Sequence, residues 1–124
     1  MVIIDTNIVI DYLRRRDKSL YEGLFEQEKE TIGISLITVQ ELFAGQSIND
    51  TKEEEFLTTL FSVLKILPYT YETAQLAGEI LRDAVDPIGF ADAAIAATAI
   101  INNSSLYTKN VRHFRKIKNL ELAK

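Results

Sequence analysis

The segment Val2-Ile3-Ile4-Asp5-Thr6-Asn7 gives the first indication of the fold. Three apolar residues are too few for a helix, and the Asp, Thr and Asn that follow favour strand ends and helix caps. Apolar residues then recur at near-helical spacing, at Ile8, Val9, Tyr12 and Leu13, before the basic group 14–16. The segment therefore predicts a buried strand that leads directly into a helix.

The same alternation of short apolar runs and amphipathic segments continues along the chain. We expect further strands at 32–35, 65–67 and 106–107, and a weak final strand at 120–122. We expect helices at about 20–30, from Thr38 onward, at 53–64, 71–85 and 90–101, and a turn or short helix at 110–114. Strands that alternate with helices imply an α/β fold with a parallel sheet covered on both faces. Ligands of such folds gather at the carboxyl ends of the strands.

Length and composition fit one globular domain over residues 1–124. The absence of cysteine excludes disulfides, thiolate zinc sites and cysteine nucleophiles, and it fits a reducing compartment. The longest apolar runs are far shorter than the roughly 20 residues of a membrane helix, and the N-terminus lacks the basic start and cleavage site of a signal peptide. We therefore expect a cytoplasmic protein with no membrane segment.

The charges are unevenly distributed, although the net charge is −4. Residues 1–18 and 109–124 together carry ten Lys and Arg against four Asp and Glu, whereas residues 19–108 carry four against fourteen. If the two ends meet in the fold, their basic residues form a rim that attracts a polyanion, because local potential steers phosphate binding. Ordinary solvated surface charge is the alternative for any one of these clusters.

Three carboxylates stand where strands end or helices begin. Asp5 directly follows the first predicted strand, and capping of the next helix would explain it equally well. Glu41 has the spacing of a capping box with Thr38, which is its alternative role. Asp92 lies in the first turn of an alanine-rich helix, where it either favours the helix dipole or approaches the interior, paired or bound to a metal. If the three converge, their oxygens suit Mg²⁺ or Mn²⁺, and a water retained by Mg²⁺ can attack a phosphate.

Four short motifs occur in a particular order over nearly the whole chain. They are VIIDTN at 2–7, SLITVQEL at 35–42, IGFADAAIAA at 88–97 and LYTKNVRHF at 106–114. Together they resemble the PIN-domain family, in particular the VapC-like toxins of toxin–antitoxin pairs. The resemblance implies a three-layer α/β/α fold with about five parallel strands, frequent homodimers, and cleavage of RNA that depends on Mg²⁺ or Mn²⁺. It also implies frequent inhibition by a partner antitoxin, and Asp5, Glu41 and Asp92 as catalytic and metal-binding acids.

The last motif departs from the family pattern. The family often places a further acid at the position of Asn110 or at that of His113, and neither residue is acidic here. Asn110 can still bond a metal-bound water or offer its carbonyl oxygen, but it adds no charge, so both one and two metal ions remain open. His113 is either an exposed residue beside Phe114 or a phosphate contact or proton carrier.

Several further residues receive supporting roles. Thr6 and Thr108 are expected to orient ligands or waters, although both residue types are common where strands end. Asp86 is either a substitute for the missing acid or a turn residue before Pro87. His113 and basic residues near the two ends are candidates for guiding an RNA backbone: Arg14, Arg15, Arg16, Lys109, Arg112, Arg115, Lys116 and Lys118.

Other enzyme classes fit less well. A haloacid-dehalogenase-like phosphatase needs a second Asp two positions after the first, where this chain has Asn7. A single histidine cannot build a typical His-based zinc site, and there is no Gly-rich phosphate loop. Two alternatives remain beside a toxin endoribonuclease: a non-catalytic RNA-binding or assembly module with a weakened metal site, and a nuclease that processes RNA without being a toxin.

Overall fold

The structure is a computed structural model that describes residues 1–15, 31–45 and 51–123. The predicted helix at about 20–30 and Arg16 lie outside the described residues, as does the side chain of Arg15. None of the helices formed by the described residues is long and apolar enough to cross a membrane.

Four parallel strands form one sheet within the described residues, in the order β3-β2-β1-β4. They are β1 (Val2–Ile4), β2 (Ile32–Ser35), β3 (Lys65–Leu67) and β4 (Ser105–Tyr107). β1 lies inside the sheet because Val2 pairs with Ile32 on one side and with Ser105 on the other. The predicted α/β class and parallel sheet are confirmed.

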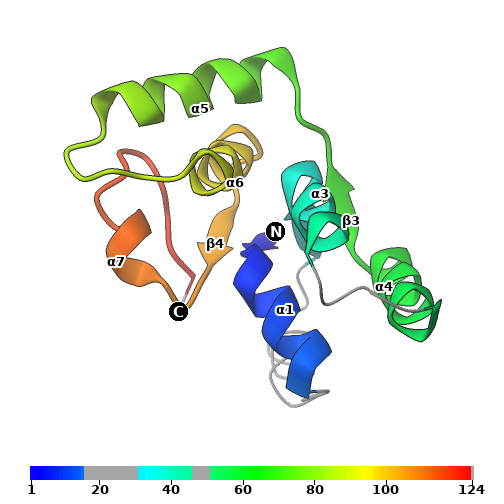
Figure 1. Ribbon diagram of the computed structural model, residues 1–124. Helices are drawn as coiled ribbons and strands as arrows, with labels where there is room; N and C mark the ends of the chain where they lie inside the picture. Colours follow the sequence, from blue (N-terminus) through cyan, green and yellow to red (C-terminus); the bar gives the residue numbers. More distant parts are fainter. Residues whose placement is uncertain (16–30, 46–50, 124) are drawn as a thin grey trace.

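Helices cover both faces of this sheet (Figure 1). The described helices are α1 (Thr6–Arg15), α3 (Leu36–Ala44), α4 (Thr51–Val63), α5 (Tyr71–Asp83), α6 (Phe90–Ile101) and α7 (Val111–Phe114). Successive residues of β1 point to opposite faces: Ile4 packs in one core with apolar residues of α1, α3 and α4, and Ile3 packs in the other with residues of α6 and α7. The result is the expected three-layer arrangement.

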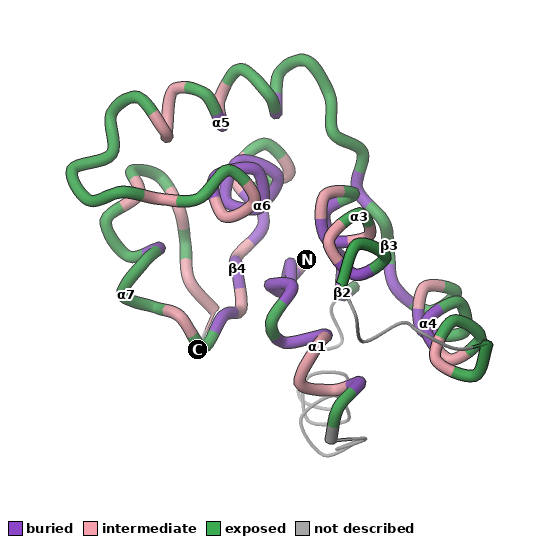
Figure 2. The backbone as a smooth tube through the Cα atoms, in the orientation of Figure 1, coloured by how far each residue is buried: buried purple, intermediate pink, exposed green. Residues whose placement is uncertain are grey.

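The alanine-rich helix α6 has a long buried stretch among the described residues. Every residue from Ala93 to Ala99 is buried, and Figure 2 shows α6 beneath the mostly exposed α5. Small side chains let α5 approach closely, and Ala77 of α5 packs against Ala93 and Ala97. The prediction of a central helix at 90–101 is therefore confirmed.

Two local predictions were wrong. The helix expected from Thr38 begins at Leu36, because Ser35 is its N-cap and its Oγ accepts a hydrogen bond from the Ile37 amide at 3.2 Å. Thr38 and Glu41 therefore lie inside α3 and form no capping box. The strand expected at 120–122 is reduced to a single bridge between Leu122 and Leu106, because the chain turns just before it.

That turn has a clear backbone cause. Asn119 has a φ of 68°, in the left-handed region that Asn tolerates better than most residues. The segment then meets β4 through two backbone hydrogen bonds of 2.8 Å, from Leu106 to Glu121 and from Ala123 to Leu106. The described sheet therefore has four strands and one bridge in place of about five strands.

Candidate active site

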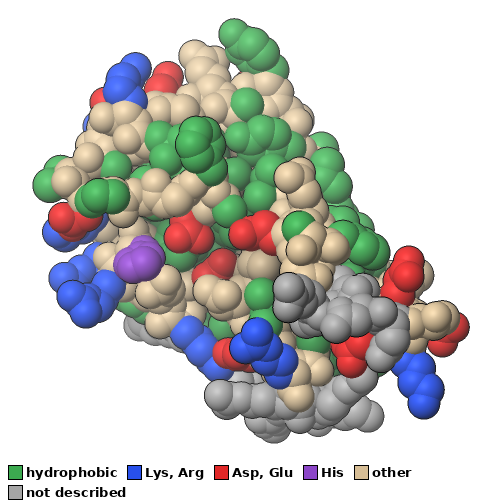
Figure 3. Space-filling model, viewed as in Figure 1, with side chains coloured by type: hydrophobic (Ala, Val, Ile, Leu, Met, Phe, Trp, Pro, Cys, Tyr) green, Lys and Arg blue, Asp and Glu red, His purple; other side chains and the backbone are tan. Residues whose placement is uncertain are grey.

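The carboxyl ends of β1, β2 and β4 meet at one edge of the sheet. Asp5 follows β1 directly, and Thr108 follows β4. α3 leaves the end of β2 and carries Glu41 on its face toward α1, while the N-terminal turn of α6 contributes Asp92. Figure 3 shows acidic side chains gathered at the centre of this face, bordered by the histidine and by Lys and Arg side chains.

Asp5 is held in place from several sides. It is 2% exposed, and the Thr108 hydroxyl donates a 2.8 Å hydrogen bond to its Oδ2. Burial is the largest influence and raises the pKa of Asp5. Hydrogen bonds from Thr108 and from the backbone of Thr6 and Asn7 act in the opposite direction without cancelling it. Asp5 therefore caps α1 with a buried carboxylate at the edge of the sheet, and its role as a metal ligand stays a prediction.

Glu41 is fixed by a short chain of hydroxyl groups. The Thr6 hydroxyl donates to Glu41 Oε1 at 2.7 Å, and Thr6 Oγ1 lies 3.0 Å from Thr38 Oγ1. Because the single Thr6 proton goes to Glu41, Thr38 is the donor to Thr6. The sequence analysis did not predict this contact of Thr38, although its spacing of three residues from Glu41 on a helix could have placed both residues on one face.

Asp92 is electrostatically coupled to the other two acids. Its side chain is 30% exposed, and burial is the main cause that raises the pKa of Asp92. The negative charges of Asp5 and Glu41 raise the pKa of Asp92 further, whereas His113 lowers it. The charges of Asp5 and Glu41 therefore act on Asp92, which also stands in the first turn of α6, where the helix dipole favours an acid.

Residues of the last motif are joined by hydrogen bonds beside these acids. The Asn110 amide donates to Thr108 Oγ1 at 2.9 Å, and Asn110 Nδ2 lies 3.0 Å from His113 Nδ1. His113 Nδ1 is in turn 3.9 Å from Asp92 Oδ2, and the His113 side chain is 58% exposed. His113 is thus both exposed and adjacent to a site acid, and it is the described side-chain partner of Asn110.

The donor set fits a hard divalent cation in its chemistry. Three carboxylates supply only oxygen ligands, which Mg²⁺ and Mn²⁺ prefer. A cation would also relieve the repulsion that raises the pKa of Asp92. Within residues 1–15, 31–45 and 51–123, no group of three or more His, Asp or Glu side chains is already arranged to hold a metal ion. The acids fit the cation by charge and type, and metal binding itself stays a prediction.

The basic candidates around the site differ in whether they form ion pairs. Lys109 pairs with Asp11 of α1 at 2.9 Å, and Lys116 pairs with Asp86 at 2.6 Å. The remaining described candidates, Arg14, Arg112, Arg115 and Lys118, are exposed. Asp86 is itself exposed and is not among the groups that shift the pKa of Asp92, so the structure places it with Lys116 and apart from the three acids.

Comparison with protein families agrees with this geometry. A family model described as the PIN domain matches residues 2–120. The chain belongs to the PIN-domain family, and the resemblance inferred from the four motifs is confirmed.

Within that family, the chain is similar to proteins named as VapC ribonucleases. The chain is 31% identical to Ribonuclease VapC1 of Methanocaldococcus jannaschii, over 98% of this chain and 84% of that protein. It is 32% identical to Ribonuclease VapC2 of Rickettsia felis, over 97% of this chain and 94% of that protein.

Solved structures give the same answer for the fold. The crystal structure of VapBC2 from Rickettsia felis, bound to a DNA fragment from their promoter, contains a chain with a TM-score of 0.88 and 30% identity, covering 99% of this chain and 98% of that one. DNA-bound VapBC from Salmonella typhimurium gives a TM-score of 0.86 at 26% identity, covering 98% and 96%.

Proposed function

We propose that this protein is a divalent-metal-dependent endoribonuclease and the toxin component of a toxin–antitoxin pair. The observation that carries the proposal is the placement of Asp5, Glu41 and Asp92 on separate segments at the carboxyl edge of the sheet, where hydroxyl groups of Thr108 and Thr6 hold Asp5 and Glu41. The charges of Asp5 and Glu41 also raise the pKa of Asp92. The similarity to proteins named as VapC ribonucleases, over nearly their full length, supports RNA as the substrate. The similarity to chains of VapBC structures supports an antitoxin as the partner.

In this proposal Asp5, Glu41 and Asp92 hold one or two Mg²⁺ or Mn²⁺ ions. The bound metal supplies polarisation of the phosphate and a lower pKa for water at neutral pH. Thr108 holds the carboxylate of Asp5 in place, as Thr6 does for Glu41. The Thr6 hydroxyl donates to one oxygen of Glu41, which leaves the other oxygen for a cation, whereas Asp5 also accepts hydrogen bonds from the backbone of Thr6 and Asn7.

The basic residues near the chain ends guide the RNA backbone toward the acids. Arg14 lies on α1, and Arg112, Arg115 and Lys118 belong to the segment that follows β4, so exposed cations flank the site from two elements. β1 and β4 are neighbouring strands, which is why the two basic ends of the chain approach each other. A homodimer and a cytoplasmic location complete the proposal, as predictions.

A cleavage assay with matched substitutions tests the proposal. RNA is incubated with the purified protein in Mg²⁺, in Mn²⁺ or in EDTA, and the ends of the products are sequenced. Cleavage is expected only with metal, and Asp5→Asn, Glu41→Gln and Asp92→Asn are expected to abolish it. Glu55→Gln on the exposed surface of α4 removes the same charge as Glu41→Gln and should leave cleavage unchanged. Metal-dependent cleavage that survives in all three site variants would exclude this site.

A non-catalytic RNA-binding module is the second candidate. The absence of an acid at Asn110, and the absence of a ready-made metal group among the described residues, both favour it. The same assay separates the two functions, because a binding module retains RNA in EDTA and in Mg²⁺ alike and never cuts it. A nuclease that is not a toxin would cleave RNA and would have no antitoxin partner. A neighbouring gene for a small DNA-binding protein would favour the toxin function.

A further inference from the structure

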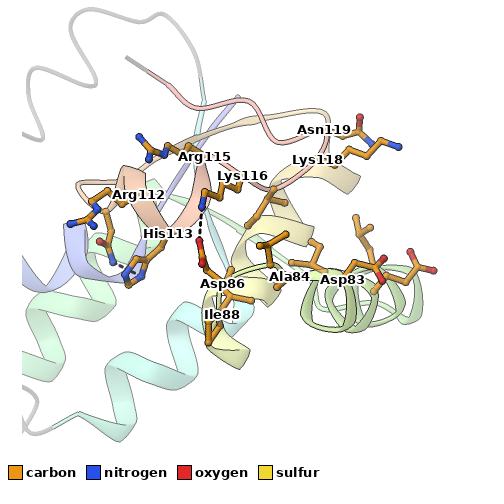
Figure 4. Close-up of a pocket in the computed structure, with 17 residues that line it drawn as sticks. Asp83, Ala84, Asp86, Ile88, Arg112, His113, Arg115, Lys116, Lys118 and Asn119 are labelled. Carbon is orange, nitrogen blue, oxygen red and sulfur yellow. Dashed lines mark hydrogen bonds and ion pairs between the residues drawn. The ribbon is translucent and has the colours of Figure 1, made fainter.

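A groove of about 940 Å³ lies beside the three acids. It runs between α5, the loop 84–88 and the segment 110–119 (Figure 4). Asn110 and His113 line the groove, and His113 also approaches Asp92 to 3.9 Å. An RNA strand whose phosphodiester bond is cleaved at the acids would therefore continue into this groove. The groove is large enough for a small-molecule ligand.

The charges that line the groove are segregated. Arg112, Arg115, Lys116 and Lys118 come from the segment after β4 and form a basic wall, whereas Glu79, Asp83 and Asp86 come from α5 and the loop after it and form an acidic wall. The 2.6 Å ion pair between Lys116 and Asp86 crosses from one wall to the other (Figure 4). Partly buried apolar side chains, Ile80, Ile88 and Ile117, also line the groove.

An occupant must match all three kinds of lining at once. An acidic wall repels phosphate, so a phosphodiester lies along the basic wall. The apolar side chains suit the flat face of a base, and carboxylates accept hydrogen bonds from base N–H groups. A nucleotide carries these features on three different parts, in the arrangement that the groove offers.

The free charges on each wall define the contacts more closely. Lys116 and Asp86 already pair with each other, and Asp83 pairs with Arg82. Among the described residues, Glu79 forms no side-chain hydrogen bond and interacts with Arg82 only electrostatically. Lys118, like Arg112 and Arg115, forms no ion pair within the described residues, so it can meet a phosphate without breaking one. Guanine presents two neighbouring N–H donors that fit both oxygens of one carboxylate, whereas uracil presents mainly acceptors.

We propose that this groove binds the nucleotide next to the cleaved phosphate, with its phosphate at Lys118 and a guanine base at Glu79. The inference rests on the proposed RNA cleavage and deepens it, because it adds a base preference to a site whose acids recognise only phosphate and metal. The separate basic and acidic walls favour a nucleotide over a peptide, because a peptide backbone does not place an anionic group on one side and hydrogen-bond donors on the other.

Calorimetric titration of the metal-free protein tests the groove directly. The probes are guanosine 5′-monophosphate, uridine 5′-monophosphate and inorganic phosphate, in EDTA. The guanosine nucleotide is expected to bind at least fivefold more tightly than the uridine nucleotide, a factor that corresponds to about 1 kcal/mol. Lys118→Gln should weaken both nucleotides about fivefold, and Glu79→Gln should remove the difference between them. Lys52→Gln on α4, an exposed lysine outside the groove, is the matched control and should change neither.

Two results would overturn the inference. Equal affinity for both nucleotides and inorganic phosphate would show that no base is recognised. A Lys118→Gln variant that binds both nucleotides as tightly as Lys52→Gln does would show that Lys118 does not hold the phosphate. If groove substitutions weaken only the binding of a co-purified antitoxin, the groove is a protein-docking surface and the inference also fails.

The cleavage assay separates this failure from that of the proposed function. If the wild-type protein cleaves RNA and Glu79→Gln cleaves it with the same KM and the same base preference, the groove inference alone is rejected. Selective binding of the guanosine nucleotide by a protein that never cleaves RNA rejects the nuclease and supports the groove.

Discussion

Asp5→Asn is expected to stabilise the metal-free protein while it abolishes cleavage. Asp5 is 2% exposed, and burial raises the pKa of its carboxyl even though the hydrogen bonds of Thr108 oppose the shift. A raised pKa means that the neutral carboxyl fits the folded protein better than the carboxylate, by about 1.4 kcal/mol for each pH unit. Asn resembles the neutral carboxyl in shape and caps a helix as well as Asp does.

The expected gain is modest because several effects oppose one another. Asn110 and the hydroxyl groups of the site stay in place, but the bond from Thr108 loses its charge assistance, which costs about 1 kcal/mol. Against this, the substitution removes a buried charge and its repulsion with Asp92. We expect a net gain of about 1 kcal/mol, which raises Tm by roughly 2–8 °C for a domain near this size.

The gain has a defined pH dependence. The folded-state pKa of Asp5 is raised, so the wild-type protein becomes more stable as the pH falls through that value, and the full benefit is present below the unfolded pKa of about 3.9. Asn does not titrate. The advantage of Asp5→Asn should therefore be largest near pH 7 and should shrink as the pH falls toward 4.

Thermal unfolding by calorimetry measures this difference, in EDTA and in Mg²⁺. Mg²⁺ should raise the Tm of the wild-type protein more than that of Asp5→Asn, because binding to the folded state alone stabilises it. Glu55→Gln on α4 serves as the charge control. A Tm that falls in Asp5→Asn at every pH would refute the reasoning and would identify Asp5 as a structural cap with no site penalty.

Three further results are expected. Asn110→Asp should tighten divalent-metal binding about tenfold, equal to about 1.4 kcal/mol, in calorimetric titration, and equal affinity in Asn110→Asp and Asn110→Ala would place this residue outside the metal site. Arg14→Gln should lower the salt-dependence slope of RNA binding by about 0.7, as one lost phosphate contact predicts, whereas an unchanged slope would make Arg14 a spectator. Ala96→Leu in the buried stretch 93–99 of α6 should destabilise the fold by about 1–3 kcal/mol in chemical denaturation, and a neutral result would contradict the close packing around this helix.

Much of the fold could be predicted because local pattern and burial agree. The run Val2–Ile4 is buried on both faces and leads directly into α1, and the alanine-rich α6 has the bounds expected from its composition. The capping box failed because Ser35, three residues before Thr38, competes for the same role and lies closer to the strand end. Strand 120–122 failed because pairing depends on a partner and on a turn that local hydrophobicity does not encode.

The acids of the site could be nominated from sequence, but their supports could not. Asp5 stands at a strand end and Asp92 at a helix start, where the topology of a parallel sheet brings residues together, and Glu41 lies inside α3, the helix that leaves the end of β2. Thr38 joins Glu41 only through Thr6, from another helix, and this contact exists only after α1 and α3 pack. The spacing of three residues could have placed Thr38 and Glu41 on one helix face, but their link through Thr6 depends on tertiary distances that the local segment does not encode.

The bond between Thr108 and Asp5 joins residues 103 positions apart, and it has a consequence for synthesis of the chain. β1 is made long before β4, one of its two neighbours in the sheet. A nascent chain that stops before β4 leaves one edge of β1 unpaired and Asp5 without its hydroxyl partner. Since distant pairings form slowly and late, Asp5 gains its hydroxyl partner only after β4 has been made and has paired with β1.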